Sequence, residues 1–229
     1  MKWLPVTILA LLGLLSLNTA FGADETSASL TATELAKEDQ NPIARIMRVQ
    51  IEDNVQFGFG PNNGVLNFLR LQPVIAFRLS KGWSLLARPG IPIVHQPWPQ
   101  SADGLGDIIL QLFLTPNSKG KLFWGVGPAF VFPSATGKII GSDKWSMGPS
   151  GVVVYNRGPW VLGLLVNQVW SFAGDDTRKG ISAMTLRPIL NYNLPRGWYL
   201  TSSPSMAASW KSPNSDRWLV PVGGGFGKA

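Results

Sequence analysis

The sequence predicts an all-β protein, an antiparallel transmembrane β-barrel built as a meander of about ten strands. Three observations lead to this prediction. Apolar and polar residues alternate, residue by residue, over segments of about ten residues. Clusters of turn residues separate these segments, and prolines recur inside them. The start of the chain has the form of an export signal.

Residues 1–22 predict a signal peptide that is cleaved before Ala23. Lys2 supplies the positive charge, and Leu4–Leu17 is an apolar run with small residues after it, at Ala20 and Gly22. The run is too short and wrongly flanked for a spanning helix, since about twenty apolar residues are needed to cross a bilayer. A retained membrane anchor is the alternative interpretation of this segment.

Residues 23–44 predict a short polar leader on the periplasmic side. The stretch 33–38 favours a helical turn or two, which Asn41-Pro42 would end. The leader is either tucked into the mouth of the barrel or a disordered terminus.

Residues 45–229 predict a single barrel domain. In the segment 67–79, Leu69, Leu71 and Phe77 lie on one face, and Arg70 and Gln72 lie on the other, because alternate side chains of a strand point to opposite sides. The runs expected to form strands are 45–59, 67–79, 83–93, 105–115, 122–132, 145–155, 159–170, 181–193, 197–210 and 217–228. Short and long connections alternate between them, which indicates tight turns on one rim and longer loops on the other.

Tryptophan marks the ends of the expected strands. The chain has ten tryptophans. Those near strand termini are Trp83, Trp98, Trp124, Trp145, Trp160, Trp170, Trp198, Trp210 and Trp218. Since tryptophan prefers the headgroup level of a bilayer, this placement predicts two aromatic girdles. The alternative is a soluble barrel whose tryptophans pack in its core.

The prolines are the feature that fits a barrel least well. Proline removes a hydrogen bond from a strand ladder, so it is normally confined to edges and bulges. Pro73, Pro89 and Pro128 nevertheless fall inside expected strands. Their regular spacing predicts a belt at one height, near one rim where water reaches the backbone.

Composition restricts the classes of function. Only 14% of residues are charged, against about 25% in typical soluble domains. There is no cysteine and a single histidine, so neither a disulfide framework nor a thiolate metal site is possible. The net charge of +7 is compatible with nucleic acid, but export argues against that partner. It suits anionic lipid headgroups or an anion-attracting pore better.

The face opposite the apolar one would line the lumen of the barrel. The residues expected to line a pore are Arg70, Gln72, Arg78, Arg88, Arg187, Asn191, Tyr199 and Thr201. Rings of arginine favour anions in pores. Alternatively, the arginines pair with acidic residues and fill the interior. We expect no catalytic residue, no metal ligand and no cofactor, since His95 is a lone histidine at a strand end.

Several stretches from residue 41 to the end resemble a bacterial family of exported β-barrels related to the outer-membrane proteins of the phenol meta-pathway. These stretches are 41–44, 71–75, 104–107, 124–128, 158–161, 188–193, 197–200 and 220–225. The resemblance implies an outer-membrane location and passage of small hydrophobic or aromatic compounds, and it supplies no catalytic residues. Members of the family continue for about two more strands. We therefore expect that this chain is truncated at its C-terminus and that its full form has about twelve strands.

Together these patterns predict a channel or transporter of the outer membrane that passes small molecules passively and is not an enzyme. Its expected partners are outer-membrane lipids and lipopolysaccharide, a small-molecule permeant and the outer-membrane assembly machinery, and not nucleic acid. One alternative is an outer-membrane barrel with a lipid A-modifying or structural envelope role. Another is a soluble periplasmic β-barrel that binds a ligand.

Overall fold

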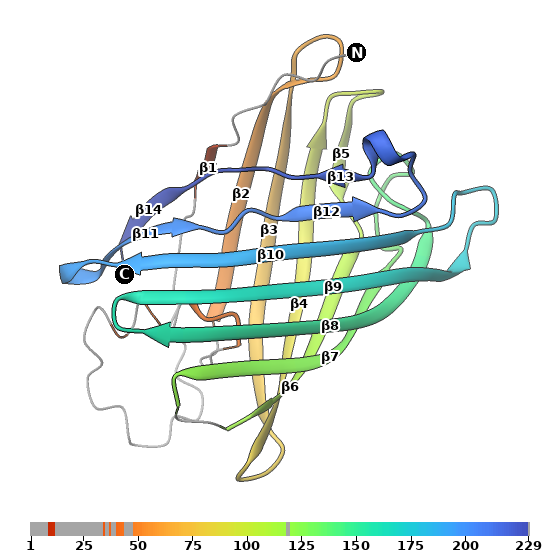
Figure 1. Ribbon diagram of the computed structural model, residues 1–229. Coiled ribbons are helices and arrows are strands. Elements are labelled where there is room, and N and C mark those ends of the chain that lie inside the picture. Colours follow the sequence, from red (N-terminus) through yellow and green to blue (C-terminus); the bar gives the residue numbers. More distant parts are fainter. Residues whose placement is uncertain are drawn as a thin grey trace.

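The computed structural model describes residues 9–11, 34, 37, 40–43, 48–117 and 120–228. These residues form one 14-stranded sheet, in which every neighbouring pair is antiparallel (Figure 1). The strands are β1 (Leu9–Leu11), β2 (Arg48–Phe59), β3 (Gly64–Arg78), β4 (Trp83–Gln96), β5 (Ala102–Leu105), β6 (Ile108–Pro116), β7 (Leu122–Phe132), β8 (Lys144–Arg157), β9 (Trp160–Gly174), β10 (Ser182–Asn193), β11 (Trp198–Ser202), β12 (Met206–Ser209), β13 (Trp218–Leu219) and β14 (Gly225–Lys228). Consecutive strands pair along most of the chain, so the predicted all-β meander is confirmed.

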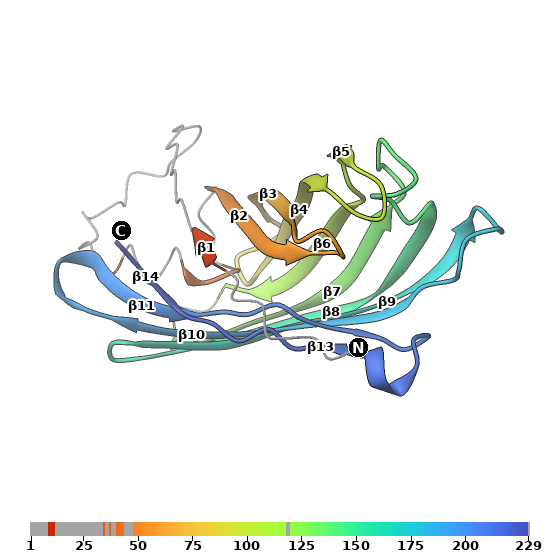
Figure 2. The ribbon, with the colours of Figure 1, turned by 90° about the horizontal axis from the view of Figure 1, so that it is seen from above.

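The sheet is curled but not closed. Its order runs from β1 and β2 at one edge to β11 and β14 at the other. Figures 1 and 2 show that β2–β4 curl over to face β8–β10 across a trough. Leu9–Leu11 lie within the expected signal peptide and pair with Asp53–Val55 of β2. Cleavage before Ala23 would therefore leave β2 as the edge strand.

Every run expected to form a strand contains one, but the last two runs are divided. The run 197–210 is split into β11 and β12, because Pro204 has no backbone N–H to continue the ladder. The run 217–228 contains only the short strands β13 and β14. A further short strand, β5, folds back on the end of β4 in a connection that was expected to be a loop.

Most connections alternate in length, as expected, and the exception is the four-residue turn 60–63 between β2 and β3. β3–β4, β8–β9 and β10–β11 are joined at one rim by the short turns 79–82, 158–159 and 194–197. At the opposite rim, β7–β8 and β9–β10 are joined by the longer loops 133–143 and 175–181. Within the described residues, no helix has the length and apolarity needed to cross a membrane.

The prolines inside strands lie near the middle of those strands, so the expected position near a rim is wrong. Prolines of adjacent strands nevertheless lie opposite one another, as the expected belt at one height requires. Pro128 and Pro149 are direct partners in the β7–β8 ladder. The β3–β4 ladder is interrupted between Leu71↔Ile91 and Ile75↔Ala87, which is where Pro73 and Pro89 fall. A similar gap separates the pairing of β10 with β11 from its pairing with β12, around Pro188 and Pro204. The missing N–H groups are thus concentrated at a few local breaks.

One glycine beside these breaks has no room for a side chain. A Cβ at Gly148 would collide with the backbone carbonyl of Gln168 on β9, whereas a Cβ at Gly151 on the same strand meets nothing within 4 Å. Since a backbone atom cannot move aside cheaply, we expect Gly148→Ala to lower the unfolding free energy by about 1–3 kcal/mol. Gly151→Ala should stay within about 0.5 kcal/mol of the unmodified protein.

Guanidinium unfolding of the purified protein in detergent micelles would measure both glycine variants. The unfolding midpoint of Gly148→Ala should be clearly lower than that of Gly151→Ala. Equal midpoints would contradict the close approach of β8 and β9 at this position.

The two faces of the sheet differ in chemical character. Along β4, the side chains of Ser84, Leu86 and Arg88 are buried on the concave face, while Trp83 and Ile93 are exposed on the convex face. An apolar cluster lies on the concave side and consists of Ile43, Leu86, Phe113, Val152, Val154, Val161, Leu165 and Ile189.

All nine tryptophans expected near strand ends are exposed on the surface. Several begin a strand, such as Trp83, Trp160 and Trp198. Neighbouring rings pack edge to face, as Trp83 and Trp124 do with ring centroids 5.9 Å apart. None of these nine rings lies in the core, contrary to what the soluble-barrel alternative requires.

Candidate binding cavity in the concave face

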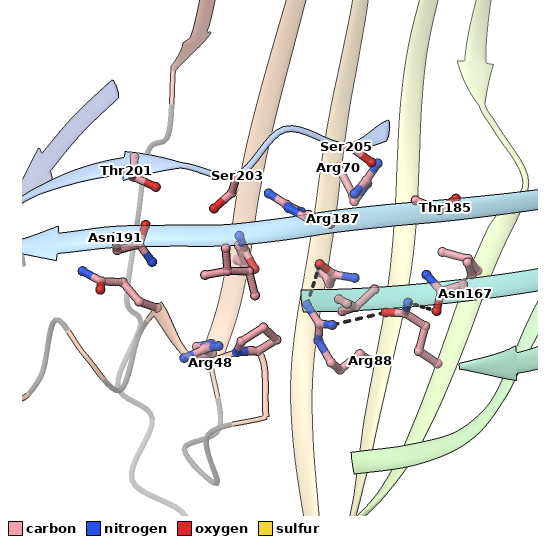
Figure 3. Close-up of a pocket in the computed structure, with 18 of the residues that line it drawn as sticks. Arg48, Arg70, Arg88, Asn167, Thr185, Arg187, Asn191, Thr201, Ser203 and Ser205 are labelled. Atoms are coloured by element: carbon pink, nitrogen blue, oxygen red, sulfur yellow. Dashed lines mark hydrogen bonds between the residues drawn. The ribbon is translucent and has the colours of Figure 1, made fainter. Parts of the chain in front are cut away.

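A cavity of about 240 Å³ opens in the concave face of the sheet (Figure 3). Of the residues expected to line a pore, those that line this cavity are Arg70, Gln72, Arg88, Arg187, Asn191, Tyr199 and Thr201. They come from β3, β4, β10 and β11, so the curl of the sheet brings together residues that are far apart in sequence.

Arg78 is the exception among the expected lining residues. It has the same strand parity as Arg70, but it is the last residue of β3 and is exposed. The cavity ends before that rim, so Arg78 lies outside it. Alternation correctly assigned its face of the strand but could not assign its distance from the rim.

Arg88 is the centre of a buried hydrogen-bond network. It is 3% exposed, and its guanidinium donates to Gln111 Oε1 at 3.2 Å and to Gln72 Oε1 at 3.1 Å. Gln111 Nε2 donates in turn to Asn167 Oδ1 at 2.8 Å, across the trough from β6 to β9. The Ser150 hydroxyl donates to the same Asn167 oxygen. Figure 3 shows the bonds that leave the guanidinium of Arg88 and the bond that ends on Asn167.

Glu52 on β2 is a functional candidate that the sequence patterns did not single out. Its carboxylate lies 3.2 Å from Arg187 Nη1 and 3.7 Å from Arg70 Nη1. Glu52 stands directly opposite Arg70 in the β2–β3 register. The alternation of Arg48, Gln50 and Glu52 on one face of the expected strand 45–59 could have indicated it.

The interpretation that the interior arginines pair with acidic residues holds for part of the set. Arg70 and Arg187 share one carboxylate, as expected for arginines that fill the interior. Arg88 instead bonds to neutral carboxamides. Among the ion pairs of the described residues, it takes part in none.

The described end of the leader lies inside the trough. Glu34, Lys37 and Gln40 have helical backbone conformation. The side-chain amides of Gln40 and Asn193 exchange two hydrogen bonds, of 2.9 and 3.2 Å. Asn41 is buried, and its carbonyl accepts a 2.5 Å hydrogen bond from Arg48. These contacts hold residues 40–43 against the concave face, and the rest of the expected leader lies largely outside the described residues.

His95 pairs with an acidic residue at the rim. Its Nδ1 lies 2.5 Å from Asp103 Oδ1, across the β4–β5 pair, and both side chains are largely exposed. Among the hydrogen bonds of the described residues, His95 has no hydroxyl partner that could act as a nucleophile. The part of the chain that the structure describes also holds no cluster of three or more potential metal ligands.

No family model matches the chain, and no curated protein and no solved structure is significantly similar to it. The fold therefore stands on the structure itself, and the resemblance to the meta-pathway barrels stays an expectation.

Proposed function

We propose that the chain is an outer-membrane β-barrel protein that lets small molecules pass through its interior. The observation that carries this proposal is the contrast between the two faces of one curled sheet. The convex face is apolar and bordered by tryptophan, whereas the concave face carries buried arginines, amides and hydroxyls beside its apolar cluster. A water-soluble protein would place these surfaces the other way round.

The convex face is unusually apolar for a protein in water. Leu162, Leu164 and Leu200 are examples of large apolar side chains that are more than a third exposed on it. Soluble monomers seldom expose contiguous apolar patches of more than a few hundred Å². Hydrocarbon would cover this surface, and the exposed tryptophans would then lie near the two headgroup layers.

A barrel in lipid must have no unpaired edge, because hydrocarbon offers no partner for free backbone groups. We propose that the edges at β2 and at β11–β14 are paired in the membrane. The segment 40–43 and the Arg88 network narrow the interior. Passage would therefore be restricted to small solutes.

Heat-modifiability tests the barrel itself. The chain would be expressed with its own N-terminus in a Gram-negative host, and outer membranes would be run on SDS gels with and without boiling. We expect a fast-migrating band that shifts after boiling. A soluble periplasmic protein without a mobility shift would contradict the membrane proposal.

Planar-bilayer conductance and liposome swelling test passage. We expect small, stable conductance steps and uptake of small solutes. A heat-modifiable barrel that shows neither conductance nor uptake would keep the fold in the membrane but contradict the channel.

A further inference from the structure

Arg88 is a buried cation without an anionic partner among the described residues. It is 3% exposed, two of its nitrogens donate to neutral amides, and its Nε atom has no hydrogen-bond partner. Burying a charge that is not paired is costly. The charges around Arg88 add to the imbalance, because the described lining of the cavity also contains Arg70 and Arg187 but no acidic residue. Among the ion pairs of the described residues, the carboxylate of Glu52 is shared between Arg70 and Arg187 and does not contact Arg88.

We infer that the cavity is a binding site for a small organic carboxylate. The planar guanidinium of arginine matches a carboxylate and holds it with two parallel hydrogen bonds. Arg88 would supply this contact, since its network already fixes its orientation. Ile109, Leu165 and Ile189 line the same cavity and would contact the apolar part of the ligand. An inorganic anion would leave these three side chains without a partner.

The inference rests on the proposed function, because it names the class of molecule that the interior passes. It also makes a separate claim, namely that the molecule is retained at equilibrium. Binding can be measured on the purified protein without any membrane current. The two proposals can therefore fail independently.

The experiment compares butyrate with butyramide, which have the same size and differ in the charge of the head group. The unfolding temperature of the full chain in detergent is measured at rising concentrations of each, with sodium chloride keeping the ionic strength constant. A ligand that binds only the folded state raises this temperature. We expect butyrate to raise it in a saturable manner and butyramide to leave it unchanged.

Variants of Arg88 and Arg78 then test whether butyrate binds at Arg88. Arg88→Gln should weaken butyrate binding by about ten- to a hundredfold, as expected for loss of charged hydrogen bonds. Arg78→Gln removes an arginine outside the cavity and should bind butyrate like the unmodified protein. Arg88→Lys keeps the charge without the planar fork and should retain part of the affinity.

Four results would overturn the inference. They are equal temperature shifts with butyrate and butyramide, no shift with either, full butyrate binding by Arg88→Gln, and a shift with sodium phosphate as large as that with butyrate at equal ionic strength. If Arg88→Gln does not fold, two other results decide whether the inference stands. They are the comparison of butyrate with butyramide on the unmodified protein and the butyrate affinity of Arg88→Lys. Butyrate binding by a protein without conductance would contradict the channel and leave this site standing.

Discussion

Replacing Glu52 with glutamine is expected to lower the unfolding free energy by about 3–5 kcal/mol, the cost of removing one partner from a buried ion pair. Glu52 is 9% exposed and is within 4 Å of both Arg70 and Arg187. Its removal leaves two mostly buried guanidinium groups that face each other without a carboxylate between them. Glutamine retains the shape of the side chain but cannot compensate the two charges.

Asp53→Asn is the matched control for this prediction. Asp53 is the next residue of β2, points to the opposite face, and accepts a hydrogen bond from the neutral amide of Asn67 at 2.7 Å. Its replacement removes the same charge but should cost only about 1 kcal/mol. The guanidinium midpoints of unfolding of the two variants test this difference in unfolding free energy. The heat-modifiable band reports the fraction of folded protein at each guanidinium concentration. Equal midpoints would show that the Glu52 contacts contribute nothing beyond an ordinary hydrogen bond.

Glu52→Gln should also change the ion selectivity of a conducting barrel. Removing Glu52 raises the positive charge of the interior, so the permeability ratio of chloride to potassium should increase. Reversal potentials in a salt gradient measure this ratio. A shift toward potassium would contradict the location of Glu52 on the permeation path.

Replacing Ile43 with aspartate is expected to release the leader from the trough. Ile43 is 3% exposed and belongs to the apolar cluster that contains Leu86 and Phe113. An ionised carboxylate in this cluster would cost several kcal/mol without a partner. The segment 40–43 can avoid that cost by leaving the cavity, because none of its residues belongs to a strand.

Two measurements follow the released leader. Trypsin should cleave the folded variant after Lys37 faster than it cleaves the unmodified protein, and the conductance step should become larger. Ile43→Val is the control, since it loses one methylene, about 0.5–1.5 kcal/mol, and should remain docked. Unchanged cleavage and conductance in Ile43→Asp would show that this contact does not hold the segment inside.

The elements of the sheet were predictable because they depend on local alternation. Arg70 and Gln72 were correctly assigned to the inner face, since the side-chain period of a strand is independent of its neighbours. The positions of the tryptophans at strand ends followed from the same alternation and from turn residues. Pro204 could not be interpreted from local alternation. Whether a proline breaks a strand depends on whether its backbone nitrogen faces a neighbouring strand, which the local sequence does not specify.

The sequence by itself determined the class of fold, the order of the strands and the face of the strand on which the four expected lining arginines lie. The tertiary structure decided which of these residues meet. Glu52 and Arg187 lie 135 positions apart in the chain, and Gln111 and Asn167 lie 56 apart. These contacts depend on the curl of the sheet and on the register summed over several strands, and a pattern of nearby residues specifies neither.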